Sequence, residues 1–410
     1  MLFSPYNIVA YFQPILSADS DAVYAYEVLG RFIDSDGTVK SLGYFFSDAN
    51  TTDEMALMID RIVRRYAMQK YVEEKRTEYL FINIRLAWLE KYADKPEELP
   101  TILWVQEFGI APDRIVIEIT EEEFNTSDAC IHVLTYYRRA GFRIALDDYG
   151  KNASNIDRLA QLHPDIIKIN IDYIHKSEKS YHYREYLKTL SNFADAIGSE
   201  VLYEGIETRR QLDICMSSKG RFYQGFLIAP PQASMQDAEV NQIIFADSIK
   251  HAYKALHKKI KYADELKASL DSKIKNFLYE NPFFYKNENR DAYLEKLFHE
   301  LPEAVRIYLC NEHGDQMTCN FEWHRGNVTY RDYRGKNWAW RGFFHEALET
   351  FIAGETSCLS VVYRDFTTKK RVFTYFYAFA QDVFFFADIN SGPFSSKKKT
   401  VPNCMSFNEG

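Results

Sequence analysis

Short apolar runs alternate with amphipathic segments over residues 1–230, and this alternation is the strongest constraint on the fold. The amphipathic stretches at 53–74 and 182–198 have the apolar spacing of helices. Strand-length apolar runs lie at 79–83, 114–120, 143–149, 165–171, 200–206 and 221–227. Because strands alternate with helices, the pattern predicts βα units around a parallel sheet. The series of units fits either a closed (β/α)8 barrel or an open doubly wound sheet.

A segment without glycine or proline follows at 241–281, directly before Pro282. Its apolar residues have a 4-3 spacing, which predicts one long helix with an apolar seam. The seam consists of Ile249, Tyr253, Leu256, Ile260, Ala263, Leu270, Ile274 and Phe277. Lys267 interrupts it and would set the register of a paired helix. Two interpretations stand: the seam pairs with a second copy of the chain, or the helix packs on its own domain.

Residues 286–390 have a different pattern of predicted elements. Two strands around a turn at 313–315, a helix near 340–355 and aromatic strands near the end predict an antiparallel α+β module. Two interpretations of this module stand. It is a plain domain for dimerisation or packing, or it contains a small-molecule pocket lined by Trp338, Trp340, Phe343 and Tyr375. The predicted organisation is therefore 1–240 for the βα domain, 241–285 for the linking helix and 286–400 for the module.

The composition excludes several classes of protein. A net charge of −8 argues against a broad basic face that binds DNA. No apolar stretch reaches the roughly 18 residues of a membrane span, and no basic segment precedes the first apolar run, as a signal peptide would require. The six cysteines contain no CxxC pair, which is typical of reduced cytosolic thiols. We therefore expect a cytoplasmic protein with no DNA partner and no membrane span.

Polar residues stand near the carboxyl ends of the predicted strands. They are Asn83, Glu118, Asp147, Asp148, Lys168, Glu204 and Gln224. In a barrel these strand ends form one rim, where active sites are built. Oxygen-rich sets of this kind suit Mg²⁺ or Mn²⁺ rather than zinc. Taken singly, each residue has an ordinary alternative, such as a helix cap for an Asp pair or an edge strand for a lysine. The coincidence over several strands favours a common site.

These residues fall within motifs that resemble the EAL-domain family of cyclic di-GMP phosphodiesterases. The name motif reads EVLGR at 27–31 and is preceded by YFQPI. FINI, IEITE, ALDDYG, IKIN, YEGIET and QGF follow in the family's order, through about residue 235. The whole chain is similar to the YkuI type of this family, in which a small PAS-like module follows the EAL domain.

The resemblance implies an α/β fold: a modified TIM (β/α)8 barrel, a linking helix and a small α+β PAS-like regulatory domain. It also implies metal-dependent hydrolysis of cyclic di-GMP to linear pGpG, with Mg²⁺ or Mn²⁺ as cofactor. By motif, the metal ligands are Glu27, Asn83, Glu118, Asp147 and Asp148. The catalytic residues are Glu204 as general base, Lys168 beside the attacking water, and Asp148 at a second metal. The substrate-binding residues are Arg31 on the phosphate, Glu27, Gln224 and Glu207. Glu121 supports the loop after the Asp pair.

The loop at 151–155 departs from the family pattern. Asn152, Ala153 and Asn155 replace the family's second glycine, its aromatic residue and its second serine, and Asn170 replaces a carboxylate near the site. In the family this loop arranges the second metal and a dimer contact. Two functions therefore stay open: a phosphodiesterase, or a catalytically weak or inactive receptor that signals through its dimer and C-terminal domain. A homodimer is expected, and the ligand or partner of the C-terminal domain stays unknown.

Overall fold

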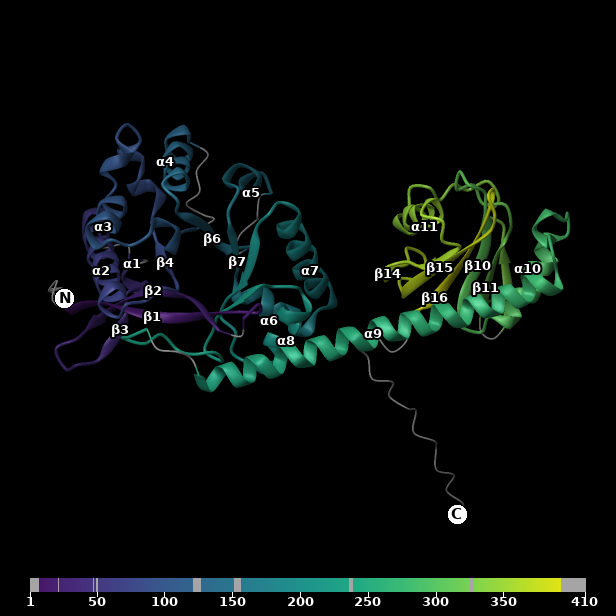
Figure 1. Cartoon of the computed structure of the whole chain (residues 1–410), viewed down its shortest axis with the longest axis horizontal. Helices are drawn as coiled ribbons and strands as arrows, with labels where there is room; N and C mark the ends of the chain where they lie inside the picture. Colours follow the sequence, from purple (N-terminus) through teal and green to yellow (C-terminus); the bar gives the residue numbers. More distant parts are fainter. Residues whose placement is uncertain are drawn as a thin grey trace, which may run out of the picture. The chain divides into compact units, whose positions relative to one another are not determined.

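The computed structural model describes residues 7–20, 22–46, 48, 51–120, 127–150, 156–235, 239–324 and 327–391. The chain divides into two compact units, Met1–Lys254 and Ala255–Gly410 (Figure 1). The division falls within helix α9 (Glu239–Glu280), so one continuous helix belongs to both units. In the described part of the chain, no helix combines the length and apolar character needed to cross a membrane.

The first unit is a closed barrel. Its described strands are β1 (Ile8–Ser17), β2 (Val23–Ile33), β4 (Tyr79–Asn83), β5 (Ile115–Thr120), β6 (Arg143–Tyr149), β7 (Ile166–Ile169), β8 (Glu200–Tyr203) and β9 (Phe222–Tyr223). Neighbouring strands from β2 to β9 pair in parallel, whereas β1 pairs antiparallel with both β2 and β9 and closes the sheet. Strand β3 (Val39–Ser41) adds to β2 outside this closed path. The predicted modified (β/α)8 barrel is confirmed, and the open doubly wound sheet is wrong.

One apolar side chain from each barrel strand fills the interior. This apolar floor consists of Ile15, Ala25, Phe81, Val116, Ala145, Ile166, Leu202 and Phe222, all with no exposed surface. Successive side chains of a strand point to opposite faces, so residues two positions away from the floor also point inward. The next inward-facing residues therefore form a layer above the floor.

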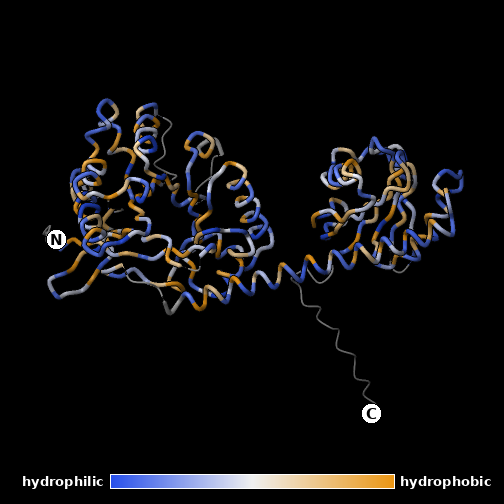
Figure 2. The backbone as a smooth tube through the Cα atoms, viewed as in Figure 1, coloured by the Kyte–Doolittle hydropathy of each residue, from blue (hydrophilic) through white to orange (hydrophobic). Residues whose placement is uncertain are grey.

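Helices cover the outside of the barrel (Figure 1). They are α1 (Gly43–Phe46), α2 (Asp53–Glu73), α3 (Pro100–Phe108), α4 (Asp128–Arg139), α5 (Ile156–Leu162), α6 (Ile171–Lys179), α7 (Tyr181–Ala196) and α8 (Arg209–Ser217). The 3-10 turns of this unit are η2 (Leu86–Trp88), η3 (Glu90–Tyr92), η4 (Pro96–Glu98) and η5 (Pro112–Arg114). Outward-facing strand residues such as Ile117, Ile144 and Ile167 are buried beneath these helices in one continuous core. Figure 2 shows the resulting pattern of apolar strands and mixed helices.

Three strands are shorter than the sequence pattern predicted. Strand β7 ends at Ile169 because Asn170 caps α6, its side-chain oxygen accepting a hydrogen bond from the Asp172 amide at 2.9 Å. Strand β8 ends at Tyr203, and β9 consists of two residues. Glu204 and Gln224 therefore follow directly after their strands.

Helix α9 packs on its own chain at both ends. Phe245 is buried in the barrel core, and Leu270, Ile274 and Phe277 are buried in the core of the C-terminal unit. Lys267 forms an ion pair with Asp271 at 3.1 Å. In the C-terminal part of the helix, the predicted seam therefore packs on its own domain, which is the second of the two interpretations.

The middle of α9 retains an apolar stripe on its surface. Tyr253, Leu256 and Ile260 are 67%, 54% and 53% exposed. Spacings of three and four residues place these side chains on one face of the helix. This exposed part of the predicted seam is the part that remains available to a second chain.

The C-terminal unit is an antiparallel sheet with a helical layer on each face. Its strands are β10 (Ala304–Cys310), β11 (Asn320–His324), β12 (Asn327–Arg331), β13 (Ser357–Leu359), β14 (Tyr363–Arg364), β15 (Arg371–Ala380) and β16 (Val383–Asn390), with the order β12-β11-β10-β16-β15-β13 and β14 beside β15. Its remaining elements are η6 (Phe284–Lys286), α10 (Arg290–Glu300) and α11 (Gly342–Ile352). Alternation along β16 places Phe385 in the core with α9 and α10, and Phe384 and Phe386 in the core with α11. The predicted α+β PAS-like domain is confirmed.

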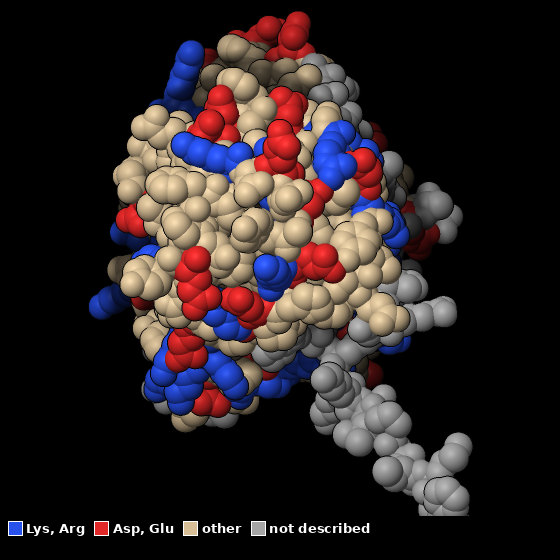
Figure 3. All heavy atoms as spheres, turned by 90° about the vertical axis from the view of Figure 1, so that its right-hand side faces the viewer, with Lys and Arg blue, Asp and Glu red and all other residues tan. Residues whose placement is uncertain are grey.

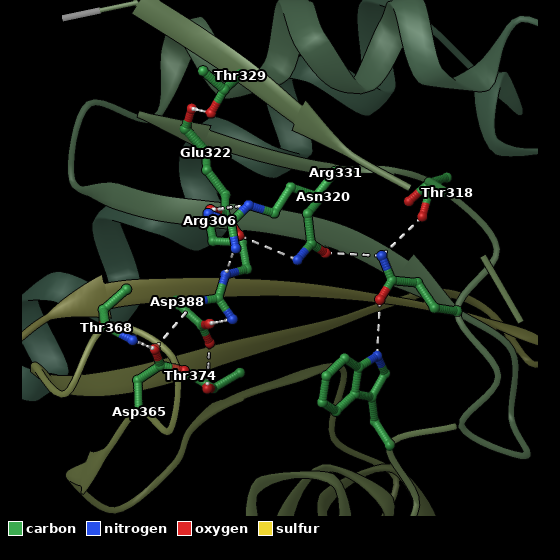
Figure 4. A network of polar contacts seen from close by, with 12 residues as sticks. Arg306, Thr318, Asn320, Glu322, Thr329, Arg331, Asp365, Thr368, Thr374 and Asp388 are labelled. Atoms are coloured by element: carbon green, nitrogen blue, oxygen red, sulfur yellow. Dashed lines mark hydrogen bonds and ion pairs between the residues drawn. The ribbon is translucent and has the colours of Figure 1, made fainter. Parts of the chain in front are cut away.

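A buried polar network crosses this sheet (Figure 4). The Arg306 guanidinium on β10 forms ion pairs with Glu322 at 3.0 Å and with Asp365 and Asp388 at 3.3 Å each. The Thr374 hydroxyl donates a hydrogen bond to Asp388 at 2.7 Å. The network ties β14 and the following Asp365 to the middle of the sheet. On the face of this unit turned to the viewer in Figure 3, acidic and basic side chains are interspersed.

Candidate active site

Polar residues form the layer above the apolar floor of the barrel. On the parallel strands each of them lies two positions after a floor residue, and the set is Glu27, Asn83, Glu118, Asp147, Lys168, Glu204 and Gln224. Strand β1 runs in the opposite direction, so its contribution, Gln13, lies two positions before Ile15. We call this layer the carboxyl rim. The period of two along each strand turns these residues inward, and the closed barrel brings together residues that are nearly 200 positions apart in the sequence.

Lys168 is the centre of the carboxyl rim. Its ammonium nitrogen lies 2.7 Å from Glu118, 3.0 Å from Asp147, 3.3 Å from Glu204 and 3.4 Å from Glu27, measured to a carboxylate oxygen in each case. Lys168 and Glu118 have no exposed surface. A single ammonium group therefore meets four carboxylates in a place that bulk water does not reach.

Side-chain amides hold two of these carboxylates. Asn83 donates to Glu118 at 3.0 Å and to Glu27 at 3.5 Å. Gln224 donates to Glu27 at 2.6 Å and to Gln13 at 3.2 Å, and Gln13 donates to the carbonyl oxygen of Ala229 at 3.1 Å. The amides fix the orientation of the carboxylates without neutralising any charge.

The electrostatics of the rim favour additional positive charge. Burial raises the pKa of Glu118 well above its ordinary range, and burial also raises the pKa of Asp147. Burial raises the pKa of Glu204 to about 8, with Lys168 opposing the rise and the neighbouring carboxylates adding to it. Burial acts to lower the pKa of Lys168, but the four carboxylates outweigh it and raise that pKa well above its ordinary value. These carboxylates ionise readily only when cations join Lys168.

Asp148 lies beside the rim in a strained backbone conformation. Its φ angle is +56°, in the left-handed region that non-glycine residues seldom adopt. The Asn170 side chain donates a hydrogen bond to the Asp148 carboxylate at 2.5 Å. Since Asn170 also caps α6, the position of Asp148 is coupled to the start of that helix.

Arg31 and the carboxyl rim border the same cavity. The cavity has a volume of about 320 Å³, and its lining includes Arg31, Asn83, Arg85, Trp88 and Glu118. The Arg31 guanidinium donates to the carbonyl oxygen of Gly30 at 2.9 Å and lies over the Tyr11 ring. The space beside the carboxylates is therefore open to a ligand and carries arginine at its wall.

One predicted residue, Glu207, is not brought into this cluster. Glu207 is exposed at the start of α8, and its backbone amide donates to the Gln211 side chain at 2.8 Å. It forms no ion pair with the rim among the residues that the structure describes. Glu121 and the altered loop 151–155 lie outside the described residues.

The donor set of the rim fits a hard divalent cation in its chemistry. Carboxylate and amide oxygens are the ligands that Mg²⁺, Mn²⁺ and Ca²⁺ prefer. Within the described ranges, no three carboxylate, histidine or cysteine side chains are grouped as a metal site, because the carboxylates turn toward the Lys168 ammonium. Among described residues, the buried Gln224 Oε1 atom has no hydrogen bond of good geometry, whereas the buried Glu118 Oε1 and Asp147 Oδ1 atoms form ion pairs with the Lys168 ammonium, with which a cation would share them.

Comparison with known families identifies this arrangement. Residues 3–231 match the EAL domain, and residues 236–395 match an EAL-domain associated signalling protein domain. The chain therefore belongs to the EAL-domain family, and the two matches cover almost its whole length.

The similarity to one relative extends through both units. The chain is 32% identical over 391 residues to the uncharacterized EAL-domain containing protein YkuI of Bacillus subtilis, covering 93% of this chain and 94% of the relative. The crystal structure of YkuI in complex with substrate c-di-GMP and calcium superposes with a TM-score of 0.82 at 29% identity, covering 95% of this chain and 99% of that one.

Other relatives match the barrel. The probable cyclic di-GMP phosphodiesterase PdeB of Escherichia coli is 27% identical over 226 residues, which are 54% of this chain and 42% of PdeB. The manganese and cyclic di-GMP complex of Klebsiella pneumoniae BlrP1 gives a TM-score of 0.50 at 25% identity and covers 58% of each chain. Each of these relatives shares the EAL part rather than the whole architecture.

Sequence reasoning did not identify Gln13, Arg85 and Trp88. Gln13 lies in the YFQPI motif, and the antiparallel direction of β1 is the signal that places it at the rim. Arg85 lies over the Trp88 ring at 5.2 Å in the wall of the cavity. Both residues follow the carboxyl end of β4, a position at which barrel loops build binding sites.

Proposed function

We propose that the barrel binds cyclic di-GMP together with a divalent cation, Mg²⁺ or Mn²⁺, and hydrolyses one of its phosphodiester bonds to give linear pGpG. The observation that carries this proposal is the convergence of four carboxylates on one buried lysine beside an arginine-lined cavity. Membership of the EAL-domain family and the c-di-GMP and calcium complex of YkuI support it.

The rim residues hold the cation in this proposal. Glu27, Asn83, Glu118 and Asp147 are its ligands, and Asp148 contributes to a second cation. When bound, such cations neutralise the anionic phosphodiester and activate water as a nucleophile. The amide of Gln224 keeps Glu27 oriented through its 2.6 Å hydrogen bond.

The other residues bind the nucleotide and move the proton. Arg31 pairs with a phosphate of the ligand, for which a guanidinium has suitable bidentate geometry. Glu204 accepts the proton of the attacking water, a role for which a carboxylate beside that water is suited. Lys168 orients that water and balances the charge of the carboxylates. Glu207 supports the ligand from the exposed start of α8.

A second function, that of a cyclic di-GMP receptor without useful turnover, is favoured by one specific contact. Asn170 replaces a family carboxylate and holds Asp148 by a 2.5 Å hydrogen bond. A carboxylate fixed in this way is less free to bind a second cation, so binding would persist while hydrolysis slows. The replaced residues of the loop 151–155 act in the same direction.

We also propose that the protein is a homodimer whose contact includes the exposed stripe Tyr253, Leu256 and Ile260 of α9. Replacing Leu256 and Ile260 by glutamate is expected to give a monomer in light scattering. Tyr279→Glu serves as control, because Tyr279 is 89% exposed near the end of the same helix. A dimer of unchanged mass in the double variant would exclude the stripe as the contact.

Calorimetry with cyclic di-GMP, with and without Mn²⁺, tests the binding site. We expect Mn²⁺ to tighten binding, and Arg31→Ala to weaken it by about tenfold or more, the effect of losing a charge-assisted pair. The matched control is Arg65→Ala on the outer helix α2, where Arg65 pairs with Glu107 at 2.8 Å. Equal affinities in wild type and Arg31→Ala would contradict the assignment.

A further inference from the structure

A second cavity lies in the C-terminal unit, between the start of α11 and strand β14. Its volume is about 250 Å³, and its lining includes Trp340, Arg341, Phe343, Tyr363, Arg364 and Phe366. Two residues of the pocket expected from the sequence, Trp340 and Phe343, line it. The other two do not: Trp338 donates to Gln316 at 2.8 Å, and Tyr375 donates to Asp271 at 2.6 Å.

The cavity carries large aromatic side chains that face water. Trp340 is 64% exposed and Phe366 is 62% exposed, and their rings are stacked with centroids 6.2 Å apart and planes inclined by 17°. Val361, at the same cavity, is 69% exposed. Apolar surface gathered in one place is unfavourable in water, at roughly 25 cal/mol per Å². Two nearly parallel rings instead offer a flat wall on which a planar ligand can stack.

Arg341 places a positive charge against this wall. Its guanidinium carbon lies 4.4 Å from the centre of the Phe366 ring, 5.1 Å from Tyr363, 5.2 Å from Trp340 and 5.5 Å from Phe343. No carboxylate of the described residues forms an ion pair with it. A guanidinium packed between rings is weakly hydrated, and its in-plane N–H groups can pair with an anion.

The remaining charges at the cavity leave it cationic. Arg364 also lines it, with its Nε donating to the carbonyl oxygen of Lys369 at 2.7 Å. Glu346 is the acidic residue of the lining, and it accepts a hydrogen bond from the Val361 amide at 2.9 Å. Burial raises the pKa of Glu346, which reduces its ability to repel an anion.

One residue of the cavity lining, Tyr363, contacts the network around Arg306. The Tyr363 hydroxyl lies 2.7 Å from the Thr374 hydroxyl and donates to Asp388 at 3.3 Å. Asp365, directly after β14, pairs with Arg306 at 3.3 Å and accepts from the Thr368 amide at 2.6 Å. Tyr363 is thus held in place before a ligand arrives, which lowers the entropy cost of binding.

We propose that this cavity binds a small aromatic carboxylate. The ring of the ligand stacks on Trp340 and Phe366, and its carboxylate pairs with the Arg341 guanidinium. The volume admits a molecule with one ring or two fused rings and a short acidic group. This inference is independent of the chemistry proposed for the barrel, because the cavity lies wholly within the C-terminal unit.

Titration of the full-length protein with acid and amide pairs tests the proposal. The probes are benzoate and indole-3-acetate, with benzamide and indole-3-acetamide as neutral matches of the same shape, followed by calorimetry and tryptophan fluorescence. We expect each acid to bind at least tenfold more tightly than its amide. Absence of binding by both acids up to about 10 mM, or equal binding of acid and amide, would overturn the proposal.

Substitutions then locate the binding site. Arg341→Gln and Phe366→Ala should each weaken binding of the tighter acid by about tenfold or more. Arg334→Gln is the matched control, because Arg334 is exposed, pairs with Asp332 at 3.0 Å and does not line the cavity. Phe366→Ala replaces an exposed side chain and keeps the test valid if Arg341→Gln fails to fold. Unchanged affinity in a folded Phe366→Ala variant would place the acid elsewhere and overturn the assignment.

Discussion

Each unit of the chain buries one basic side chain among acidic ones, and the two clusters differ in how completely their polar atoms are satisfied. In the barrel, Lys168 meets four carboxylates within 3.4 Å. In the C-terminal unit, Arg306 meets three carboxylates within 3.3 Å. Both basic side chains are at most 9% exposed.

The Arg306 cluster is closed by neutral donors. Asp388 accepts from Thr374, Asp365 accepts from Thr368, and Glu322 accepts from Asn320 at 3.3 Å. Among the network's described buried polar atoms, Arg306 Nε alone has no hydrogen bond of good geometry, although it has an ion pair with Glu322. Such a network supports a unique sheet structure rather than chemistry.

The Lys168 cluster is left open. Within the described part of the chain, Gln224 Oε1 has no hydrogen bond of good geometry, and the Lys168 nitrogen, Glu118 Oε1 and Asp147 Oδ1 are joined by ion pairs at 2.7 and 3.0 Å without a hydrogen bond of good geometry. The cluster also borders the 320 Å³ cavity. The comparison teaches that buried charge by itself does not identify a functional site. A functional site is indicated by buried polar atoms with incomplete hydrogen bonding beside a cavity, because a ligand can then complete their interactions.

The largest predicted effect is on the closed cluster. Arg306→Met should lower the free energy of unfolding of the C-terminal unit by about 3 to 5 kcal/mol, because three carboxylates lose their buried partner. Arg331→Met is the control, since the exposed Arg331 pairs with Glu322 at 3.7 Å and should contribute less than about 1 kcal/mol. Calorimetric melting measures both. Equal, small losses would mean that the Arg306 network is not a structural centre.

Removal of the basic side chain from the open cluster should lower the stability less, and metal should reverse the loss. Lys168→Met should cost about 3 kcal/mol or less without metal, because carboxylates with raised pKa values can take up protons instead of remaining charged. Mn²⁺ at a hundredfold excess over its Kd should restore about 2.7 kcal/mol. Arg306→Met should gain nothing from Mn²⁺ beyond the gain of the wild type. Melting curves are recorded with and without Mn²⁺. The comparison would be contradicted if Mn²⁺ restored the lost stability of neither variant, or of both variants.

Asn170→Asp tests why Asp148 is held. The substitution replaces the 2.5 Å hydrogen bond with repulsion between two carboxylates and should release Asp148 for a second cation. We expect Mn²⁺ affinity to rise roughly tenfold, or about 1.4 kcal/mol, and turnover to rise with it. Asn192→Asp on the outer helix α7 is the control. Calorimetry showing no gain in metal affinity would remove the contact as an explanation for slow hydrolysis.

The smallest effect is a pH dependence of the metal-free barrel. The pKa of Glu204 is raised to about 8 in the folded state, so folding favours its protonated form. That contribution is present below the ordinary pKa near 4.5 and is lost as pH rises toward 8. The barrel should therefore lose stability over this window, and Glu204→Gln should flatten the slope. A slope that is identical in the variant would exclude Glu204 as its source.

The sequence predicts the barrel rim better than the C-terminal network for a physical reason. Rim residues such as Asn83 and Glu118 each lie near the carboxyl end of an apolar strand, so one rule locates them. The rule does not locate Gln13, because β1 runs antiparallel to its neighbours. Arg306 and Asp388, by contrast, lie within aromatic strands where a polar residue normally indicates the solvent face, and only the three-dimensional pairing shows that they are buried together.

The linking helix shows a second limit. Its 4-3 spacing correctly indicates an apolar stripe, but spacing cannot say what covers the stripe. Ile274 and Phe277 are covered by their own domain, whereas Leu256 and Ile260 remain exposed. Local pattern determines the element, and only tertiary contacts determine its partner.

The most direct test of the central claim is product formation by the purified full-length protein. Cyclic di-GMP is incubated with Mn²⁺ or Mg²⁺, and linear pGpG is followed by chromatography. We predict that wild type forms pGpG, that chelation of the metal stops the reaction, and that Glu204→Gln binds the nucleotide but reacts at least about a hundredfold more slowly. Wild-type protein that binds cyclic di-GMP and forms no pGpG with either metal would contradict hydrolysis and leave the receptor as the function of the barrel.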